Sequence, residues 1–228
     1  MTKVTLELDQ NIAYITLQNG KVNAISHQVI DELNAALDKA EQAKAVVVFT
    51  GQPGMFSGGF DLNTMHESIE AAIALVHKGS LLSRRMLSFP YPIIAACNGH
   101  AIAKGVFLLL SCDYRIGCSG PFKIGLNEVA IGMTMHNAGV EIVRGRLAPN
   151  YFNRSVVNAE IYDPETAVAA GILDMVVEPE QLQASAKKMA EHMKTLDMKA
   201  HYGTKLRVRA PLLKAIDAAI EIDLQAAQ

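Results

Sequence analysis

The sequence is short of cysteine, of net charge and of long hydrophobic runs. Its three cysteines (Cys97, Cys112 and Cys118) include no CxxC pair, so neither a disulfide framework nor a zinc site is expected. The formal net charge of −2 provides no basic field for nucleic acid. No apolar run approaches the ~20 residues of a membrane span, and the N-terminus does not read as a signal peptide. We therefore expect a cytoplasmic chain with reduced thiols, no membrane span, no nucleic-acid partner and no metal.

The sequence does contain strand-like and helix-like segments in alternation. The runs at 46–51 and 91–99 are apolar throughout, as in strands buried on both faces of a sheet. Further strands are expected at 4–8, 12–17, 114–118 and 171–177, and helices at 26–42, 69–87, 106–113, 138–146, 164–170, 181–196 and after Lys199, with Ser26 as the first N-cap. This alternation predicts right-handed βαβ units, a largely parallel sheet and thus the α/β class.

Two glycine-bearing loops, Gly51–Asp61 and Asn98–Gly105, each follow one of the buried strands. Ligands of open α/β sheets lie beyond the carboxyl ends of the strands, so we expect the two loops to face each other across one site. Unpaired backbone N–H groups at such loop-to-helix junctions can hold a developing oxyanion. The alternative is that the glycines serve only tight turns and close packing.

Motifs of other chemistries are missing, since the sequence has no GxGxxG, P-loop, GxSxG or HExxH pattern. The candidate proton-transfer group is Glu128, in a stretch from Ile124 to Met133 that is otherwise apolar apart from Asn127. Apolar surroundings raise the pKa of a carboxyl group, which suits a general base. The alternative is that Glu128 points into water from a loop.

The motifs "FSGGFDL", "NGHAIAKG" and "CDYRI…FKIGLNEVAIGM", in this order and spacing, resemble the crotonase superfamily of enoyl-CoA hydratases and isomerases. The resemblance continues to "AVAAGILDMVV". It implies a crotonase (ClpP-like) spiral of ββα units over residues 1–190 and a C-terminal helical segment over 191–228. It also implies a homotrimer or hexamer that acts on an acyl-CoA thioester in fatty acid metabolism and needs no separate cofactor.

The resemblance assigns roles to individual residues. The backbone N–H groups of Phe60 and Lys104 would form the oxyanion hole, and Glu128 would be the acid/base. The family almost always has glycine where Lys104 stands, and the ammonium is expected either to stabilise an enolate or to reach a CoA phosphate. Residues implied to contact the substrate are Lys21, Val22, Ala24, Gly58, Asp61, Leu62, Gly105 and His136.

Phe107 favours isomerisation of an enoyl-CoA over its hydration. Hydratases of this superfamily use two glutamates, and the first of them is replaced here by Phe107, which cannot carry a proton. One base suffices to move a double bond from C3 to C2, so the expected activity is that of a 3,2-enoyl-CoA isomerase. The alternatives are an enoyl-CoA hydratase (a lyase), an acyl-CoA hydrolase, and a non-catalytic CoA- or RNA-binding scaffold.

Several residues keep two interpretations. Asp61 is either an extra base or the N-cap of the next helix, and His136 is either a second acid or a helix cap. The ring of Phe60 either narrows the pocket or joins the core. Basic residues of the last helix either reach CoA phosphates or form a solvated cationic face; these are Lys205, Arg207 and Arg209.

Overall fold

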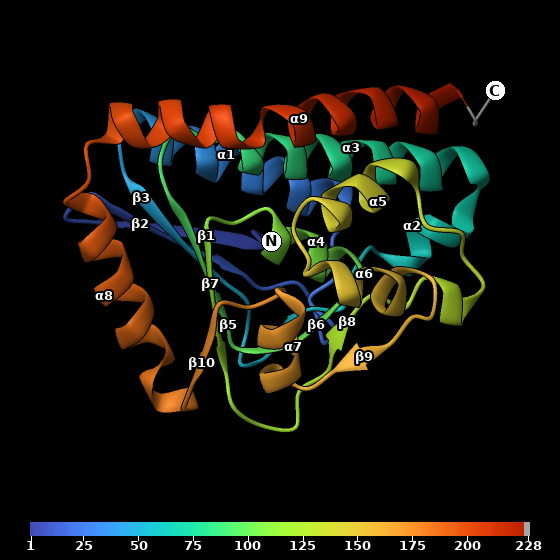
Figure 1. Ribbon diagram of the computed structural model, residues 1–228, viewed down its shortest axis with the longest axis horizontal. Helices are drawn as coiled ribbons and strands as arrows, with labels where there is room; N and C mark the ends of the chain where they lie inside the picture. The colour runs from blue at the N-terminus through green and yellow to red at the C-terminus, as the bar shows by residue number, and fades with distance from the viewer. Residues whose placement is uncertain (226–228) are drawn as a thin grey trace.

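A computed structural model describes residues 1–225, in which helices enclose a six-stranded sheet of strand order β1-β2-β3-β5-β7-β10 (Figure 1). Its strands are β1 (Val4–Asp9), β2 (Ile12–Leu17), β3 (Val46–Thr50), β5 (Ile93–Cys97), β7 (Tyr114–Cys118) and β10 (Met175–Val177). The β1 strand pairs antiparallel with β2, and every other pairing in this sheet is parallel. The expected α/β class and the expected strands are therefore confirmed.

The two segments expected as loops each contain a strand, because β4 and β6 belong to a second, smaller sheet of order β4-β6-β8-β9. Its strands are β4 (Gly54–Ser57), β6 (Gly99–Ile102), β8 (Ile124–Gly125) and β9 (Ile161–Tyr162). Glycine makes this sheet possible, because a Cβ on Gly99 would lie 2.0 Å from the carbonyl carbon of Gly54. Strands β3, β5 and β7 of the large sheet thus each lead into a strand of the small sheet before the next helix.

The helices begin where the sequence offers caps. Ser26 accepts a hydrogen bond from Val29 N, as expected, and Ser68 accepts one from Ala71 N. The helices are α1 (His27–Gln42), α2 (Leu62–Glu67), α3 (Ile69–Leu87), α4 (Lys104–Leu110), α5 (Asn137–Arg144), α6 (Pro149–Val156), α7 (Pro164–Ala170), α8 (Leu182–Lys194) and α9 (Met198–Gln225), with 3₁₀ turns η1 (Val129–Ile131) and η2 (Pro179–Gln181). The short helix α6 was not expected from the sequence, and α2 was expected only as the helix that Asp61 would cap.

The all-apolar strands are buried on both faces, as expected. Val47 and Phe49 of β3 join the main core with α1 and α3, whereas Val46 and Val48 face the opposite side, where α8 packs. The division expected after residue 190 lies within α8, and it stays a prediction of the sequence. No helix in residues 1–225 is both long and apolar enough to cross a membrane.

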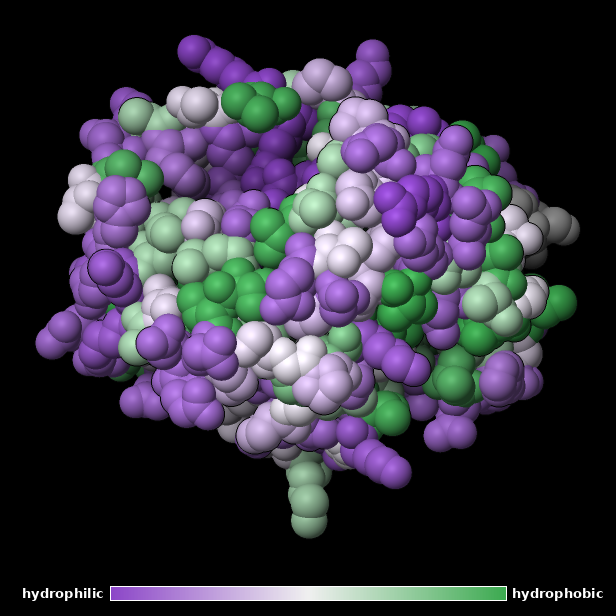
Figure 2. All heavy atoms as spheres, turned by 60° about the horizontal axis from the view of Figure 1, so that its bottom comes forward, coloured by the Kyte–Doolittle hydropathy of each residue, from purple (hydrophilic) through white to green (hydrophobic). Residues whose placement is uncertain are grey.

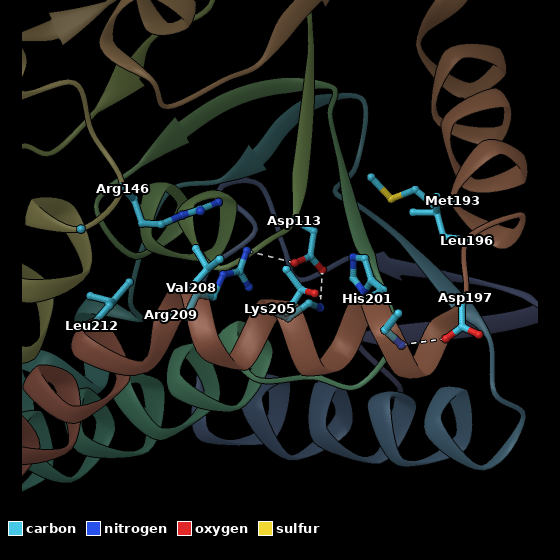
Figure 3. A pocket seen from close by; sticks show the side chains of 13 residues that line it. Asp113, Arg146, Met193, Leu196, Asp197, His201, Lys205, Val208, Arg209 and Leu212 are labelled. Carbon is cyan, nitrogen blue, oxygen red and sulfur yellow. Dashed lines mark hydrogen bonds and ion pairs between the residues drawn. The ribbon is translucent and has the colours of Figure 1, made fainter.

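The last helix, α9, lies along α3 at the top of Figure 1 and carries a buried ion cluster. Lys205 Nζ and Arg209 Nη2 lie 2.8 and 2.9 Å from the two carboxylate oxygens of Asp113, and Figure 3 shows Asp113 between them. Both cations are buried, so the interpretation of these two residues as a solvated cationic face is wrong. Arg207 is exposed.

Beside this cluster lies a cavity of about 560 Å³ between α8 and α9. The face in Figure 2 is hollowed at its upper left, and hydrophilic residues line the hollow. Charged and polar residues also line the cavity, among them Arg146 and His201. Lys205 and Arg209 line it as well, but the expected oxyanion-hole residues Phe60 and Lys104 and the expected acid/base Glu128 do not.

We predict that Asp113→Ala lowers the free energy of unfolding by about 3–5 kcal/mol, because it leaves two buried cations unpaired. The measurement is urea denaturation followed by circular dichroism. The control is Asp31→Ala, which removes an exposed ion pair with Lys78 and is expected to cost below about 1 kcal/mol. Equal losses in the two variants would contradict the structural role of the cluster.

Candidate active site

The segments around Phe60 and Lys104 are packed directly against each other. A Cβ on Gly59 would lie 3.0 Å from Ala103 Cβ and 3.5 Å from Lys104 N. A Cβ on Gly105 would lie 2.5 Å from the carbonyl oxygen of Ser57. The close approach requires both glycines and brings together two segments that are distant in the sequence.

The residues on either side of Phe60 are hydrogen-bonded to Ile25, whereas the N–H of Phe60 itself has no acceptor in residues 1–225. Ile25 N donates to Gly59 O at 2.8 Å, and Asp61 N donates to Ile25 O at 3.0 Å. In this parallel bridge the N–H of Phe60 faces away from Ile25. Within residues 1–225 the Phe60 N–H donates to no backbone or side-chain acceptor.

Lys104 is the first residue of α4, and its N–H is likewise without an acceptor in the described chain. The preceding residue, Ala103, has φ 50° and ψ −118°, a conformation that is costly for a residue with a side chain. Lys104 itself is helical, so the costly conformation lies at the residue before it. The strained turn at Ala103 directs the first N–H of α4 outward from the helix.

The Lys104 side chain does not reach outward, so contact with a CoA phosphate is excluded. It is 1% exposed, and its Nζ donates to Gly79 O at 2.6 Å and to Ser83 Oγ at 2.7 Å, both on α3. Burial lowers the pKa of the ammonium to about 7.

The Phe60 ring packs on the same part of α3. A Cβ on Gly79 would lie 2.5 Å from Cζ of Phe60 and 3.3 Å from Cε of Lys104. Phe60 is partly buried against the main core. Gly79 thus makes room for both side chains, and the interpretation of Phe60 as a core aromatic is supported.

Glu128 is buried, as expected from its apolar stretch. It is 8% exposed, its Oε2 has no hydrogen-bond partner in residues 1–225, and burial raises its pKa to about 7. It follows β8, where Gly125 O accepts a hydrogen bond from Ala103 N at 3.0 Å. This hydrogen bond ties β8 to the residue before Lys104. Glu128 follows Gly125 by three residues, so the chain that carries the carboxyl group is anchored next to the Lys104 N–H.

His136 stands at the N-cap position of α5, but its side chain does not cap the helix. Asp223 of α9 does so instead, because it accepts from Asn137 N at 2.8 Å and from Ala138 N at 3.0 Å. The His136 ring lies edge-on to Phe107, with ring centroids 5.4 Å apart. Burial and the nearby Lys104 charge lower its pKa to about 4, so the imidazole is neutral near pH 7.

A cavity of about 160 Å³ adjoins His136. His77 of α3 and Asp223 of α9 also line it, together with apolar side chains of α3. The Nδ1 atom of His77 is buried and has no hydrogen-bond partner within residues 1–225. No local pattern in the sequence indicates this grouping, because its members come from three separate parts of the chain.

The remaining expected contact residues border the two loops. Asp61 is the N-cap of α2, since it accepts hydrogen bonds from Asn63 N and Thr64 Oγ1. Gly58 N donates to Val22 O at 2.8 Å, which places the 21–24 segment beside the Phe60 loop. Exposed residues at this edge are Lys21, Val22 and Leu62, whereas Ala24 is partly exposed and Gly105 is buried.

Comparison with known proteins supplies the family. The family model for enoyl-CoA hydratase/isomerase matches residues 7–228. The chain belongs to the enoyl-CoA hydratase/isomerase family. The crotonase fold expected from the three motifs is thereby confirmed.

Solved structures of this family superpose along the whole chain. An enoyl-CoA hydratase/isomerase family protein from Pseudomonas syringae is 60% identical, with a TM-score of 0.98 over 99% of this chain and 98% of that one. A protein of Mycobacterium tuberculosis, described as an enoyl-CoA isomerase in one structure and as a probable enoyl-CoA hydratase in another, is 39% identical, with a TM-score of 0.94 over 98% of both chains in the first. A probable enoyl-CoA hydratase of Bacillus subtilis is 34% identical over 62% of this chain, a match that spans 56% of that protein.

We predict that Gly79→Ala destabilises this family member by about 1–3 kcal/mol, because the new methyl group collides with the Phe60 ring. With Phe60→Leu in the background, the same change becomes neutral or stabilising by up to ~1 kcal/mol, as for alanine in a helix interior. The measurement is a double-mutant cycle of thermal unfolding.

The matched control is Gly203→Ala in α9, where a Cβ would meet nothing within 4 Å. We expect this variant to be more stable than the wild type. If Gly79→Ala and Gly203→Ala change stability in the same direction, the packing of Phe60 against α3 is not the cause.

Proposed function

We propose that the protein is a 3,2-enoyl-CoA isomerase in which Glu128 transfers the proton and the N–H groups of Phe60 and Lys104 hold the thioester oxygen. The observation that carries the proposal is the desolvated carboxyl group of Glu128, three residues beyond Gly125, whose carbonyl oxygen accepts from the N–H of Ala103. Within residues 1–225 the neighbouring N–H of Lys104 and the N–H of Phe60 have no acceptor. The isomerase among the related structures supports it by analogy.

The proposed reaction needs one acid/base group. Ionised Glu128 removes a proton from C2 of a 3-enoyl-CoA, and the electron pair of that C–H bond moves through the thioester carbonyl onto its oxygen. The two N–H groups stabilise the resulting enolate. Glu128 then returns its proton at C4, the double bond settles between C2 and C3, and the carboxylate is regenerated.

Phe107 argues against hydration as the principal activity. It is 1% exposed on α4, one turn beyond Lys104, where the family resemblance places the first glutamate of hydratases. Hydration requires water activation and protonation of the neighbouring carbon, a task that suits two carboxyl groups. The His136 ring next to Phe107 is neutral near pH 7, so it is not available as the general acid that would replace the missing carboxyl group.

The acyl-CoA thioester is proposed to lie along the 21–24 segment and the Gly58–Leu62 loop. Val22 and Leu62 expose 50% and 53% of their surfaces there, and Lys21 is the cation on this edge. A role in fatty acid metabolism, a trimeric or hexameric assembly and a cytoplasmic location remain predictions from the sequence.

We predict that Glu128→Gln lowers isomerisation of a 3-enoyl-CoA by about 10²- to 10⁴-fold, the usual contribution of a general base. In the wild type, kcat/KM should rise with pH through about 7, because the base is active only when ionised and its pKa is raised. The assay follows conjugation of the 2-enoyl product by absorbance, with hydration and hydrolysis measured in parallel.

The control is Glu165→Gln, which changes an exposed glutamate of α7 and should leave turnover unaltered. Unchanged binding of a saturated acyl-CoA would show that Glu128→Gln keeps the fold. Full turnover in purified Glu128→Gln, or hydration that exceeds isomerisation in the wild type, would refute the proposed reaction.

A further inference from the structure

The Lys104 ammonium is a buried charge without a carboxylate partner in residues 1–225. Burial is the sole cause of its lowered pKa, with no acidic group opposing it. The other buried lysine, Lys205, differs in this respect, because Asp113 lies 2.8 Å from its Nζ. A protein seldom keeps an unpaired charge in its interior without a use for it.

Four neutral groups hold the ammonium in place. Two of its three N–H donors are used by Gly79 O and Ser83 Oγ. The ring centroids of Phe60 and Phe107 lie 5.6 and 5.9 Å from Nζ, a distance at which ring faces attract a cation. These contacts fix the position of the charge without neutralising it.

We propose that the Lys104 ammonium is a built-in positive charge that stabilises the enolate in the oxyanion hole. The inference rests on the proposed function, since it assigns a second role to a residue whose N–H already belongs to that hole. The length of one lysine side chain keeps Nζ within roughly 6–7 Å of that N–H. In a water-excluded interior a charge at this distance acts strongly on a developing anion.

The ammonium acts through its field rather than by contact with the substrate. It is 1% exposed, and its Nζ donates to Gly79 O and Ser83 Oγ of α3, so contact with a ligand in the hole is not expected. A neutral thioester carbonyl gains little from such a field, whereas an enolate gains much. Loss of the charge should therefore lower kcat and leave the binding of ground-state ligands nearly unchanged.

Few titratable groups face the ammonium. His136, from the start of α5, is neutral above about pH 4, and Asp223 of α9 lines the same cavity as His136. The facing turns of α3 and α4 contribute only Gly79, Ser83 and Phe107. A pH effect that disappears with the Lys104 amine can thus be assigned to that amine.

The test compares Lys104→Met with the wild type in two assays, namely isomerisation and the exchange of C2 protons of a saturated acyl-CoA with deuterium oxide. Methionine keeps the backbone N–H and most of the side-chain volume but removes the charge. We expect both rates to fall by about 10- to 100-fold, while the affinity for the saturated acyl-CoA changes less than about threefold. The control is Lys187→Met, which changes an exposed lysine of α8 and should alter neither rate.

The pH profile separates the charge from a merely structural role. In the wild type, the rise in kcat that follows ionisation of Glu128 should turn into a decline as pH rises further and the ammonium loses its proton. Lys104→Met should keep the rise and lack the decline. Ser83→Ala removes one acceptor that favours the charged form, so the decline should move to lower pH. Thermal unfolding should show Lys104→Met to be no less stable than the wild type, because it removes an uncompensated buried charge.

The outcomes distinguish this inference from the function on which it rests. A wild type that neither isomerises nor exchanges C2 protons overturns the proposed function. A wild type active in both assays, with the same pH profile in Lys104→Met, overturns the role of the ammonium alone. A Lys104→Met variant that is less stable and equally weakened in ligand binding also overturns it, since the lysine would then be structural.

Discussion

The packing of residues 57–60 against 103–105 is the contact on which the rest of the site depends. Gly59 and Gly105 permit it, because a Cβ at either position would meet backbone or side-chain atoms of the other segment at 3.0 Å or less. Each segment continues a strand of the small sheet into a helix, and within residues 1–225 the N–H groups of Phe60 and Lys104 have no acceptor. Two donors from distant parts of the chain thereby become neighbours without the help of any side chain.

Burial then sets the chemistry around this contact. The same desolvation that raises the pKa of Glu128 to about 7 lowers that of Lys104 to about 7 and that of His136 to about 4. The carboxyl group and the ammonium are thus both brought to the range in which they can change protonation near neutral pH. The imidazole, in contrast, is held neutral, so it contributes shape and polarity rather than charge.

The sequence predicted the buried strands, the helix caps and the family because these depend on local patterns. It did not predict β4 and β6, since glycine-rich segments such as 54–57 and 99–102 are typical of loops until a partner strand is known. It also missed the burial of Lys205, whose partner Asp113 lies 92 residues away along the chain. For Lys104, the sequence motif predicted the proposed role of the backbone N–H. It did not predict the position of the side chain, because that depends on hydrogen bonds to Gly79 and Ser83 of α3.

The identities of Lys104 and Phe107 depend on each other, because the Lys104 ammonium lies over the Phe107 ring. They stand three residues apart on α4, and the lysine Nζ lies 5.9 Å from the phenylalanine ring centroid. A glutamate at 107 would lie within ion-pair reach of that ammonium, and each charge would then neutralise the other. Phenylalanine removes this competitor and still offers a ring face to the cation. If the proposed roles hold, Phe107 and Lys104 belong to one arrangement, in which a buried ammonium stands where a second carboxyl group would neutralise it.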